Sequence, residues 1–475
     1  MEYEPVIGLE IHCRINTKTK MFCRCSNNIF NEKPNSHVCP ICMGFPGMLP
    51  LINKEVVKKS IKAALALGCQ VPEFSKMDRK SYFYPDLPKG FQISQYDLPI
   101  SEKGKVTITL PDNSTKDIGV TRLHIEDDAG KLTHRDGCSL VDFNRSGTPL
   151  MEIVSEPDIR SIEEASAYAR QLQKVVRYVD SSDADMEKGQ MRFDINVSIR
   201  PKGQKEFGTR AEVKNLNSFR SLEKAIDYEI KRQIEVVESG GNVIQETRGW
   251  DDTKEITTSQ RGKEGAADYR YFPEPDIPPL VVTKEMIEEL KKEIPELADA
   301  KSNRYQDELK LQQEHAHHLA SDASLAAYYE KALEISGEPK KTANWVLSEL
   351  LGVLKSQSLT ITDSKLSAEN LGKLVKLIED GAITNKIAKD IFPEVYEGDL
   401  DPEKVIEEKG LKVMSDTGEL EKICQDVIDR NPQIVADFKG GKEKALGSLV
   451  GQIMGATKGS ANPKTVNEIL RKLLT

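Results

Sequence analysis

Several common nucleotide-binding and catalytic motifs are absent from this chain of 475 residues. It contains no G-x-x-x-x-G-K-S/T phosphate-binding loop and no G-x-G-x-x-G fingerprint, which excludes nucleotide binding of the P-loop or Rossmann type. A glycine- and serine-rich nucleophile motif is also missing. We therefore do not expect the chain to hydrolyse amides by itself.

Long apolar runs and a secretory leader are missing as well. No stretch approaches the roughly 20 apolar residues of a membrane span, and the first four residues are acidic or apolar rather than basic. With 38% hydrophobic and 30% charged residues, the composition is that of a globular protein, and the length predicts two or three domains. The sequence therefore predicts a cytoplasmic protein with no membrane partner.

The charge is unevenly distributed. A net charge of −9 argues against non-specific nucleic-acid binding over the whole surface. From residue 438 onward, however, seven basic residues oppose two acidic ones. A module that approaches phosphate groups and a solvated helix face both fit this balance. The basic residues are Lys439, Lys442, Lys444, Lys458, Lys464, Arg471 and Lys472.

Eight cysteines in a cytoplasmic chain are not expected to form disulfides, and four of them are clustered. Cys23 and Cys25 form a C-x-C pair, and Cys39 and Cys42 form a C-x-x-C knuckle, with His37 as a spare donor nearby. This spacing suits tetrahedral thiolate coordination of zinc. The zinc would be structural, because four sulfurs leave no open position. A redox pair and unconnected buried thiols are the alternatives.

Three short segments alternate apolar and ionisable residues with the period of two that a strand requires. The segments are residues 6–12, 123–128 and 191–200. Their ionisable members are Glu10 and His12, then His124 and Glu126, then Asp194 between two arginines. Short carboxylate side chains can be held rigidly toward a shared ion, so this pattern favours a metal or phosphate site.

Glu152 joins this set from a further apolar stretch, residues 150–154. Taken one at a time, each of these residues is more often a surface residue or a satisfied core residue. The coincidence of several polar strand faces favours a shared site, because a carboxylate among apolar residues is costly to bury without a cation. Oxygen ligands with one or two imidazoles suit magnesium or manganese better than zinc.

Two further stretches have the composition of ligand-binding loops. Residues 79–95 mix cations, aromatics and amides, as segments that stack on bases and contact phosphates do. Residues 208–219 lead from a strand into a helix, where Asn217 or Ser218 is expected to be the N-cap. Three ionisable residues of this stretch remain free for function: Arg210, Glu212 and Lys214.

The order of strand and helix patterns predicts an α+β domain around a mainly antiparallel sheet. Strands are expected at 106–110, 118–123 and 192–200, and helices at 162–179, with Ser161 as N-cap, and at 221–238.

Beyond this domain the sequence predicts helices. Four prolines in residues 271–279 predict an extended linker, and after residue 283 apolar residues recur at helical spacing. A proline-bounded break at 393–402 predicts the start of a last module.

Seven strings in the first part of the chain are specific when taken together. They are VIGLEIH at 6–12, DRKSYFYPD at 78–86, IEDDAGK at 125–131, SLVDFNRSGTPL at 139–150, EIVSEPD at 152–158, VKNLNSF at 213–219 and DYRYFPEPD at 268–276. With residues 451–470, which are similar to a YqeY-like tail, they resemble GatB/GatE, the family of B subunits of the aspartyl/glutamyl-tRNA amidotransferase. The GatE branch carries a large synthetase-like insertion for which this chain has no room, so the GatB branch is the better match.

The resemblance implies one member of a heterotrimer that also contains an amidase, the A subunit, and a small C subunit. In such a glutamine-dependent carbon–nitrogen ligase, ATP and magnesium serve to phosphorylate the side-chain carboxylate of Asp or Glu misacylated to tRNA. Ammonia from the amidase, arriving through an internal tunnel, then displaces phosphate to give Asn-tRNA or Gln-tRNA. Phosphorylation supplies the leaving group that a carboxylate lacks.

The resemblance also implies roles for individual residues. The magnesium ligands and catalytic residues would be Glu10, His12, Glu126 and Glu152. Binding of ATP would involve Asp194, Arg210, Glu212 and Lys214. A structural zinc would be held by Cys23, Cys25, Cys39 and Cys42, and Lys458 and Lys464 would contact the tRNA backbone. The implied domains are a cradle at 1–290, a helical domain at 291–400 and a small helical, tRNA-binding YqeY-like tail at 401–475.

Two other interpretations remain open at this point. The chain could be a non-catalytic tRNA-binding scaffold of the same complex, whose acidic pocket holds structural magnesium. It could also be a zinc-dependent nucleic-acid-binding protein with no enzymatic role. The sequence does not decide whether Asp-tRNA, Glu-tRNA or both are substrates, because that depends on the synthetases of the organism.

Overall fold

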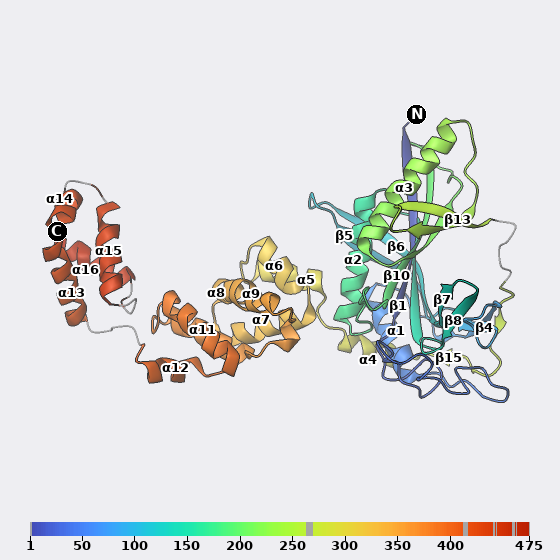
Figure 1. The fold of residues 1–475 in the computed structure, drawn as a ribbon, viewed down its shortest axis with the longest axis horizontal. Coiled ribbons are helices and arrows are strands. Elements are labelled where there is room, and N and C mark those ends of the chain that lie inside the picture. Colours follow the sequence, from blue (N-terminus) through green and yellow to red (C-terminus); the bar gives the residue numbers. More distant parts are fainter. Residues whose placement is uncertain are drawn as a thin grey trace. The chain divides into compact units, whose positions relative to one another are not determined.

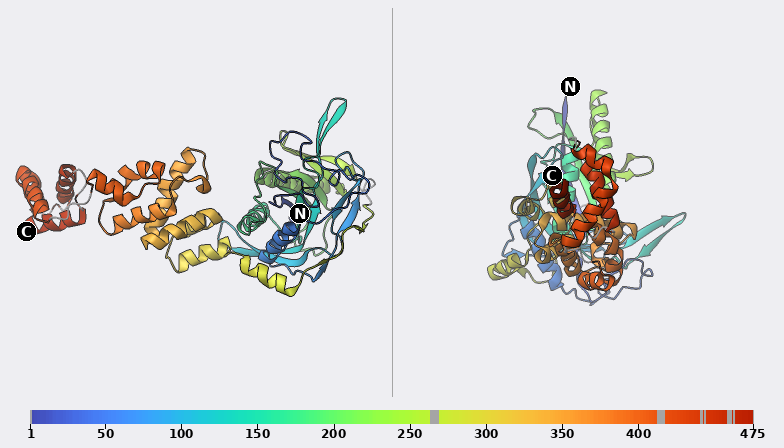
Figure 2. Two further views of the ribbon diagram at one scale, coloured as in Figure 1. Left: turned by 90° about the horizontal axis from the view of Figure 1, so that it is seen from below. Right: turned by 90° about the vertical axis from the view of Figure 1, so that its left-hand side faces the viewer.

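A computed structural model describes residues 2–262, 269–411, 417–439, 442, 444–457, 461 and 463–474. In it the chain forms two units, Met1–Leu297 and Ala298–Thr475. A sheet with helices makes up the first unit, whereas the described part of the second unit is helical (Figure 1; further views in Figure 2). This confirms the predicted α+β class with its all-helical C-terminal region. The domain limits at residues 290 and 400 stay a prediction.

An eight-stranded sheet forms the body of the first unit. From one edge to the other, its strands are Ile256–Gly262 (β13), Glu246–Asp251 (β12), Ala211–Leu216 (β11), Met191–Pro201 (β10), Tyr3–Arg14 (β1), Pro149–Ser155 (β9), Thr115–Asp127 (β6) and Ser101–Thr109 (β5). Neighbouring strands run antiparallel, apart from the parallel pair β11 and β12. The three strands predicted from the sequence are present as β5, β6 and β10.

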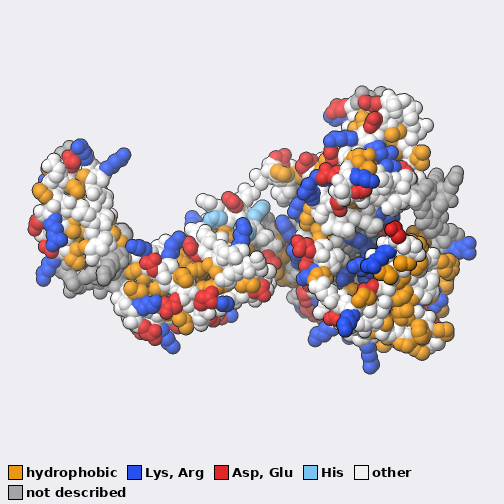
Figure 3. All heavy atoms as spheres, viewed as in Figure 1, with side chains coloured by type: hydrophobic (Ala, Val, Ile, Leu, Met, Phe, Trp, Pro, Cys, Tyr) orange, Lys and Arg blue, Asp and Glu red, His pale blue; other side chains and the backbone are white. Residues whose placement is uncertain are grey.

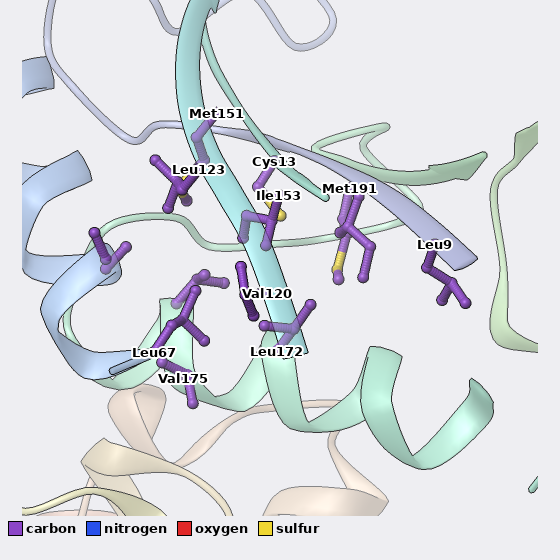
Figure 4. Close-up of a cluster of buried hydrophobic side chains, with 14 of the residues drawn as sticks. Leu9, Cys13, Leu67, Val120, Leu123, Met151, Ile153, Leu172, Val175 and Met191 are labelled. Carbon is purple, nitrogen blue, oxygen red and sulfur yellow. The ribbon is translucent and has the colours of Figure 1, made fainter. Parts of the chain in front are cut away.

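Three helices pack on one face of this sheet: Lys54–Ala66 (α1), Ile162–Tyr178 (α2) and Phe219–Glu238 (α3). Figure 4 shows apolar side chains of strands and helices in contact there, among them Met151, Ile153 and Leu172. A fourth helix, Lys284–Glu293 (α4), contacts α1. One continuous apolar core therefore fixes the face and the register of each central strand.

The two predicted helices begin at serine caps. Ser161 accepts a hydrogen bond from the backbone N–H of Glu164, as predicted for α2. The second helix begins at Phe219, two residues earlier than predicted, because Ser218 accepts from the N–H of Ser221. Ser218 was one of the two candidate caps in the sequence.

Short strands border the polar face of the large sheet. They are Phe74–Ser75 (β2), Asp78–Ser81 (β3), Phe91–Ser94 (β4), Phe272–Pro273 (β14) and Leu280–Val281 (β15), with a separate hairpin of Lys131–Arg135 (β7) and Cys138–Asp142 (β8). The proline-rich passage 271–279 is therefore not a plain linker. Its β14 pairs with β3 and places Phe272 opposite Arg79, because prolines are compatible with a short edge strand.

The second unit has two separate apolar cores. The helices of the first core are Ala298–Asp307 (α5), Gln313–Ala320 (α6), Ala323–Ser336 (α7), Pro339–Asn344 (α8), the π-helix Trp345–Leu350 (η2), Leu351–Ser356 (α9), the 3-10 turn Ile361–Asp363 (η3), Ala368–Glu379 (α10), Asn385–Gly398 (α11) and Pro402–Lys409 (α12). Those of the second core are Thr417–Arg430 (α13), Pro432–Lys439 (α14), Lys444–Ala456 (α15) and Pro463–Leu474 (α16).

The predicted break at 393–402 is shorter than expected, because residues 399–401 separate α11 from α12 but Pro393 does not end a helix. Pro393 lies inside α11, which continues to Gly398. The buried side chains of Phe392, Val395 and Tyr396 anchor the helix on both sides of the proline. Their packing offsets the backbone hydrogen bond that proline cannot make. Nowhere in the described part of the chain is a helix long and apolar enough to cross a membrane.

Candidate functional site

The register of the central strands aligns four polar side chains in one row. His12 in β1 pairs with Glu152 in β9 on one side and with Arg192 in β10 on the other. Glu152 in turn pairs with His124 in β6. Each alternates with buried apolar residues, so the row lies on the face opposite the core. A shift of one residue would turn the row into the core, and the hydrophobic pattern therefore fixes the site.

The imidazoles and carboxylates of the row are close to one another. The Nε2 atoms of His12 and His124 each lie 3.3 Å from Oε2 of Glu152. Glu126 lies two residues beyond His124 in β6, in the adjacent row of the same face: its Oε2 lies 3.9 Å from Nε2 of His124 and accepts a hydrogen bond of 3.0 Å from Oγ of Ser94. The possible ligand atoms of His12, Glu126 and Glu152 all lie within 4.8 Å of one another. We call these three residues the carboxylate–histidine cluster.

The electrostatics of the cluster favour an ionised carboxylate between two imidazoles. Burial would raise the pKa of Glu152, but the His124 and His12 imidazoles hold this pKa well below its usual value. Burial would likewise lower the pKa of His12, and the Glu152 carboxylate raises it above its usual value. Glu152 is therefore a negatively charged oxygen donor at neutral pH.

A divalent cation fits this donor set. Two buried carboxylates supply the hard oxygen donors that suit magnesium or manganese, and one imidazole adds a nitrogen donor. The Nδ1 atoms of His12 and His124 are buried and have no hydrogen-bond partner in the described part of the chain. Each ring therefore keeps a polar atom that water or a ligand can satisfy.

Glu10, the fourth predicted magnesium ligand, lies in the next row of the sheet. It pairs with Asp194 in β10, and its Oε1 accepts a hydrogen bond of 3.0 Å from Asn196. Nζ of Lys214 lies 3.6 Å from Asp194 and 2.9 Å from Glu212. The structure thus groups Glu10 with three of the predicted ATP-binding residues and beside the carboxylate–histidine cluster.

Several carboxylates lie close together around Glu10. Burial and then the Glu152, Glu212 and Asp194 carboxylates raise the pKa of Glu10, and only Lys214 among its main neighbours lowers it. Such crowding favours the approach of a cation. Arg210, by contrast, is exposed just before β11 and takes part in none of these contacts.

Two cations that the sequence did not single out lie beside the cluster. Burial alone would lower the pKa of Lys80. This pKa nevertheless lies above its usual value, in part because the Glu126 and Glu152 carboxylates are close. Its Nζ lies 5.0 Å from the ring centroid of Tyr269. Arg192 ends the row next to His12. Lys80 belongs to the stretch 79–95 with its mixed composition, and Arg192 belongs to the polar strand face 191–200. Neither sequence pattern tells which of its cations points toward the site.

The four predicted cysteine ligands come together in loops that precede α1. Their Sγ atoms all lie within 4.8 Å of one another. Tetrahedral zinc–thiolate bonds of about 2.3 Å require sulfurs this close, so the cluster is compatible with zinc. Its members are Cys23, Cys25, Cys39 and Cys42. The imidazole of the spare donor His37 is not part of this group, and its Nε2 lies 3.5 Å from Oε2 of Glu32.

Lys20 is fully buried beside this cysteine cluster. Its Nζ donates to the carbonyls of His37 and Ser146 at 2.8 and 2.7 Å and lies 3.9 Å from Sγ of Cys42. The hydrogen bond with Cys23, together with the Cys39 amide and the Lys20 ammonium, lowers the pKa of Cys42 to about 5 against the effect of burial. The cluster thus favours a thiolate, the form that binds metals.

A cavity of about 190 Å³ is lined by residues of both the cysteine cluster and β6. Cys23 and Cys42 contribute to its wall, and so do Lys89 and Asp127, which form a buried ion pair. Asp127 directly follows Glu126 in β6. The cavity therefore lies beside the end of β6, and no residue of the carboxylate–histidine cluster is part of its lining.

The predicted tRNA contacts belong to the second unit. Lys458 lies outside the described residues, and Lys464 belongs to α16. Their role stays a prediction.

Two family models match the chain. The GatB/GatE catalytic domain matches residues 5–288, and the GatB domain matches residues 327–474. The chain is 52% identical to the B subunit of the aspartyl/glutamyl-tRNA(Asn/Gln) amidotransferase of Carboxydothermus hydrogenoformans, over 100% of the chain and 99% of that protein. Proteins of the same name from Persephonella marina and Crocosphaera subtropica are 51% and 50% identical over 100% of the chain and 100% and 98% of their own lengths. Both groups of site residues and the cysteine cluster lie inside the first match.

Proposed function

The chain belongs to the GatB/GatE family, and from this premise we propose that its first unit activates the side-chain carboxylate of a tRNA-bound Asp or Glu by phosphorylation. The chain is the B subunit of a glutamine-dependent Asp/Glu-tRNA amidotransferase, a carbon–nitrogen ligase of translation. The observation that carries the proposal is the buried carboxylate–histidine cluster on the polar sheet face, flanked by Lys80 and Arg192.

The proposed reaction has two steps. An oxygen of the substrate carboxylate forms a bond to the γ-phosphorus of ATP, and the bond to the bridging oxygen breaks, so that its electron pair leaves with ADP. Ammonia then forms a bond to the acyl carbon, phosphate leaves with the electron pair of the C–O bond, and the nitrogen loses a proton. The products are Asn-tRNA or Gln-tRNA, ADP and inorganic phosphate.

The chain's own residues would hold and orient the reactants. His12, Glu126 and Glu152 would hold magnesium, which screens the repulsion between the phosphates of ATP and the attacking carboxylate. Glu10, with the neighbouring Asp194, Glu212 and Lys214, would face the remaining phosphates and their counter-ions, and Arg210 is an outer candidate for the nucleotide. The carboxylate–histidine cluster and the Glu10 group share one polar sheet face, which supports a single reaction site.

The cavity beside β6 supports delivery of ammonia to this site. Lys89 and Asp127 make part of its wall polar, and Asp127 is the chain neighbour of Glu126, so this cavity is our candidate for the last part of the ammonia path. Exposed apolar residues between the cysteine cluster and α1 support a docked partner, for which the amidase, braced by the small C subunit, is our candidate. These residues are Phe45, Met48, Leu49 and Leu51. Figure 3 shows hydrophobic side chains gathered on the lower right of the first unit.

The remaining assignments concern structure and tRNA. A structural zinc at the cysteine cluster would fix the loops that line this cavity. The basic end of the chain, with Lys458 and Lys464, would contact the tRNA backbone. We place the enzyme in the cytoplasm, where its charged tRNA substrates are made.

The test is an assay of the complete heterotrimer, formed with the amidase and the small subunit, with ATP, both charged tRNAs, and either glutamine or free ammonia. We expect Glu126→Gln and Glu10→Gln to abolish both ADP formation that depends on charged tRNA and amidation. Glu156→Gln, an exposed carboxylate just beyond β9, is the matched control and should behave as the wild type. Undiminished formation of the activated acid in the site variants would contradict the proposal and support a tRNA-binding scaffold.

A further inference from the structure

The guanidinium group of Arg192 is not held in place by hydrogen bonds. Its Nη1 lies 3.7 Å from Oδ1 of Asp128, which is too long for a hydrogen bond, and its guanidinium makes no hydrogen bond within the described part of the chain. The side chain is 27% exposed, whereas the carboxylate of Asp128 is 5% exposed. An arginine held this loosely at the end of a buried polar row can reorient its planar donors toward a ligand.

Asp128 lies between two arginines. Nε of Arg145 lies 3.6 Å from its Oδ2, and two backbone carbonyls hold that guanidinium in place. Nη1 of Arg192 approaches the other oxygen of the same carboxylate without a hydrogen bond. One carboxylate thus faces two guanidinium groups, and the N–H donors of Arg192 stay available for a ligand.

The position of Arg192 places these donors at the site. It is the cross-strand neighbour of His12 on the polar sheet face, and the next residue on that face of β10 is Asp194. It therefore lies beside both the carboxylate–histidine cluster and the Glu10 group. An anion that bridges these two groups would pass beside its guanidinium.

We propose that Arg192 is a catalytic residue that binds the peripheral oxygens of the phosphoryl group as it moves from ATP to the substrate carboxylate. The inference rests on the proposed function and adds to it the group that stabilises the transferring phosphate. Charge spreads over three oxygens of that group in the transition state, and a guanidinium offers paired donors that match two of them. Lys80, on the other side of the cluster, offers a single point charge and cannot replace this geometry.

A purely structural role for Arg192 predicts different behaviour. If Arg192 only neutralised the neighbouring carboxylates, its removal would disorder the site, and metal binding and catalysis would fall together. If it binds the phosphoryl group, its removal takes a positive charge away from the cation site. The affinity for a divalent cation then stays constant or rises while phosphoryl transfer falls. The two roles therefore move the cation affinity in opposite directions.

The experiment uses the complete heterotrimer with Arg192→Gln and Arg192→Lys. Arg200→Gln is the matched control, because Arg200 lies on the same strand and face but pairs with Glu4 at 2.6 Å, far along β10. The measurements are kcat and KM for ATP and for charged tRNA in ADP formation, and binding of Mn²⁺ without nucleotide by electron paramagnetic resonance. Glu152→Gln serves as the variant of the cation site itself.

We expect Arg192→Gln to lower kcat about 100-fold. Arg192→Lys should lose about tenfold, because it keeps the charge without the paired donors. The Mn²⁺ affinity of Arg192→Gln should be unchanged or up to about threefold higher, and Arg200→Gln should match the wild type. A kcat within about threefold of wild type, a loss confined to KM for tRNA, or a parallel loss of Mn²⁺ binding would overturn the proposal. If Glu152→Gln retained both Mn²⁺ binding and activity, the result would contradict the proposed cation site and the proposed function, whatever the Arg192 variants show.

Discussion

The first unit contains two clusters of candidate metal ligands that differ in construction, and only the carboxylate–histidine cluster is buried throughout. The cysteine cluster is made by residues 23–42 in loops, whereas the carboxylate–histidine cluster is made by residues 12–152 on three strands of one sheet. The first offers four soft sulfur donors, and the second offers one nitrogen and two carboxylates.

This difference is the reason why we propose a structural role for the cysteine cluster and a chemical role for the carboxylate–histidine cluster. Four thiolates complete a tetrahedral zinc site and leave no position for a substrate. Two carboxylates and one imidazole would leave positions of an octahedral magnesium ion open to water and phosphate. Rigid strands also hold ligands more precisely than loops do, which suits a reaction that depends on alignment.

The largest expected effect is on catalysis by the carboxylate–histidine cluster. Glu152→Gln keeps the shape of the side chain but removes the charge that both histidines face, so we expect amidation to fall about 1000-fold. Product formation on charged tRNA measures the loss, and mass spectrometry of the folded protein should show unchanged zinc content. A concurrent loss of zinc would mean that the two clusters are not independent.

The next effect is on stability through the cysteine cluster. Replacing Cys39 and Cys42 by serine removes two zinc ligands, and we expect the free energy of unfolding to fall by about 4 kcal/mol or more. Thermal unfolding measures the change, and Cys138→Ser, at an exposed cysteine, is the control. At temperatures where the variant is folded, Mn²⁺ should still bind at the other cluster. An unchanged unfolding temperature would show that these thiols hold no structural metal.

A smaller effect is expected from the residue that orients Glu126. Ser94→Ala removes the hydrogen bond of 3.0 Å to Oε2, and we expect the affinity for Mn²⁺ or Mg²⁺ to fall about tenfold. Titration of the cation in the activity assay measures the shift, which excess magnesium should reverse. If excess magnesium does not restore activity, Ser94 acts on something other than cation affinity.

The smallest effect is expected at Lys20, beside the cysteine cluster. Lys20→Met keeps most of the buried volume but leaves the carbonyls of His37 and Ser146 without their donor, so the free energy of unfolding should fall by about 2 kcal/mol. Chemical denaturation measures it. Amidation by the folded variant should remain within about threefold of wild type, and a larger loss would connect the two clusters functionally.

Much of the fold and the character of the site could be predicted from sequence, because they depend on local periodicity. The alternation of apolar and ionisable residues around Glu10 and His12 identifies the polar face of β1. The spacing of the four cysteines identifies their cluster. Strand order and register are not local. That Glu152 lies between two histidines depends on pairing among β6, β9 and β1, whose residues are far apart in the chain.

The same limit explains the details that the sequence missed. A period of two places Glu10 and His12 on one face of β1 but does not reveal that their cross-strand neighbours in β10 are Asp194 and Arg192. The prolines of 271–279 exclude a helix but do not reveal that Phe272 pairs with Arg79. Pro393 is a local helix breaker whose effect is offset by tertiary packing of Phe392 and Tyr396.

The most direct test of the account is the electron paramagnetic resonance of Mn²⁺ bound to the chain. The carboxylate–histidine cluster predicts one tight cation with coupling to an imidazole nitrogen, and this coupling should disappear in His12→Gln while zinc remains bound. A tight Mn²⁺ site whose nitrogen coupling survives in His12→Gln, or the absence of any tight site in the wild type, would contradict the account.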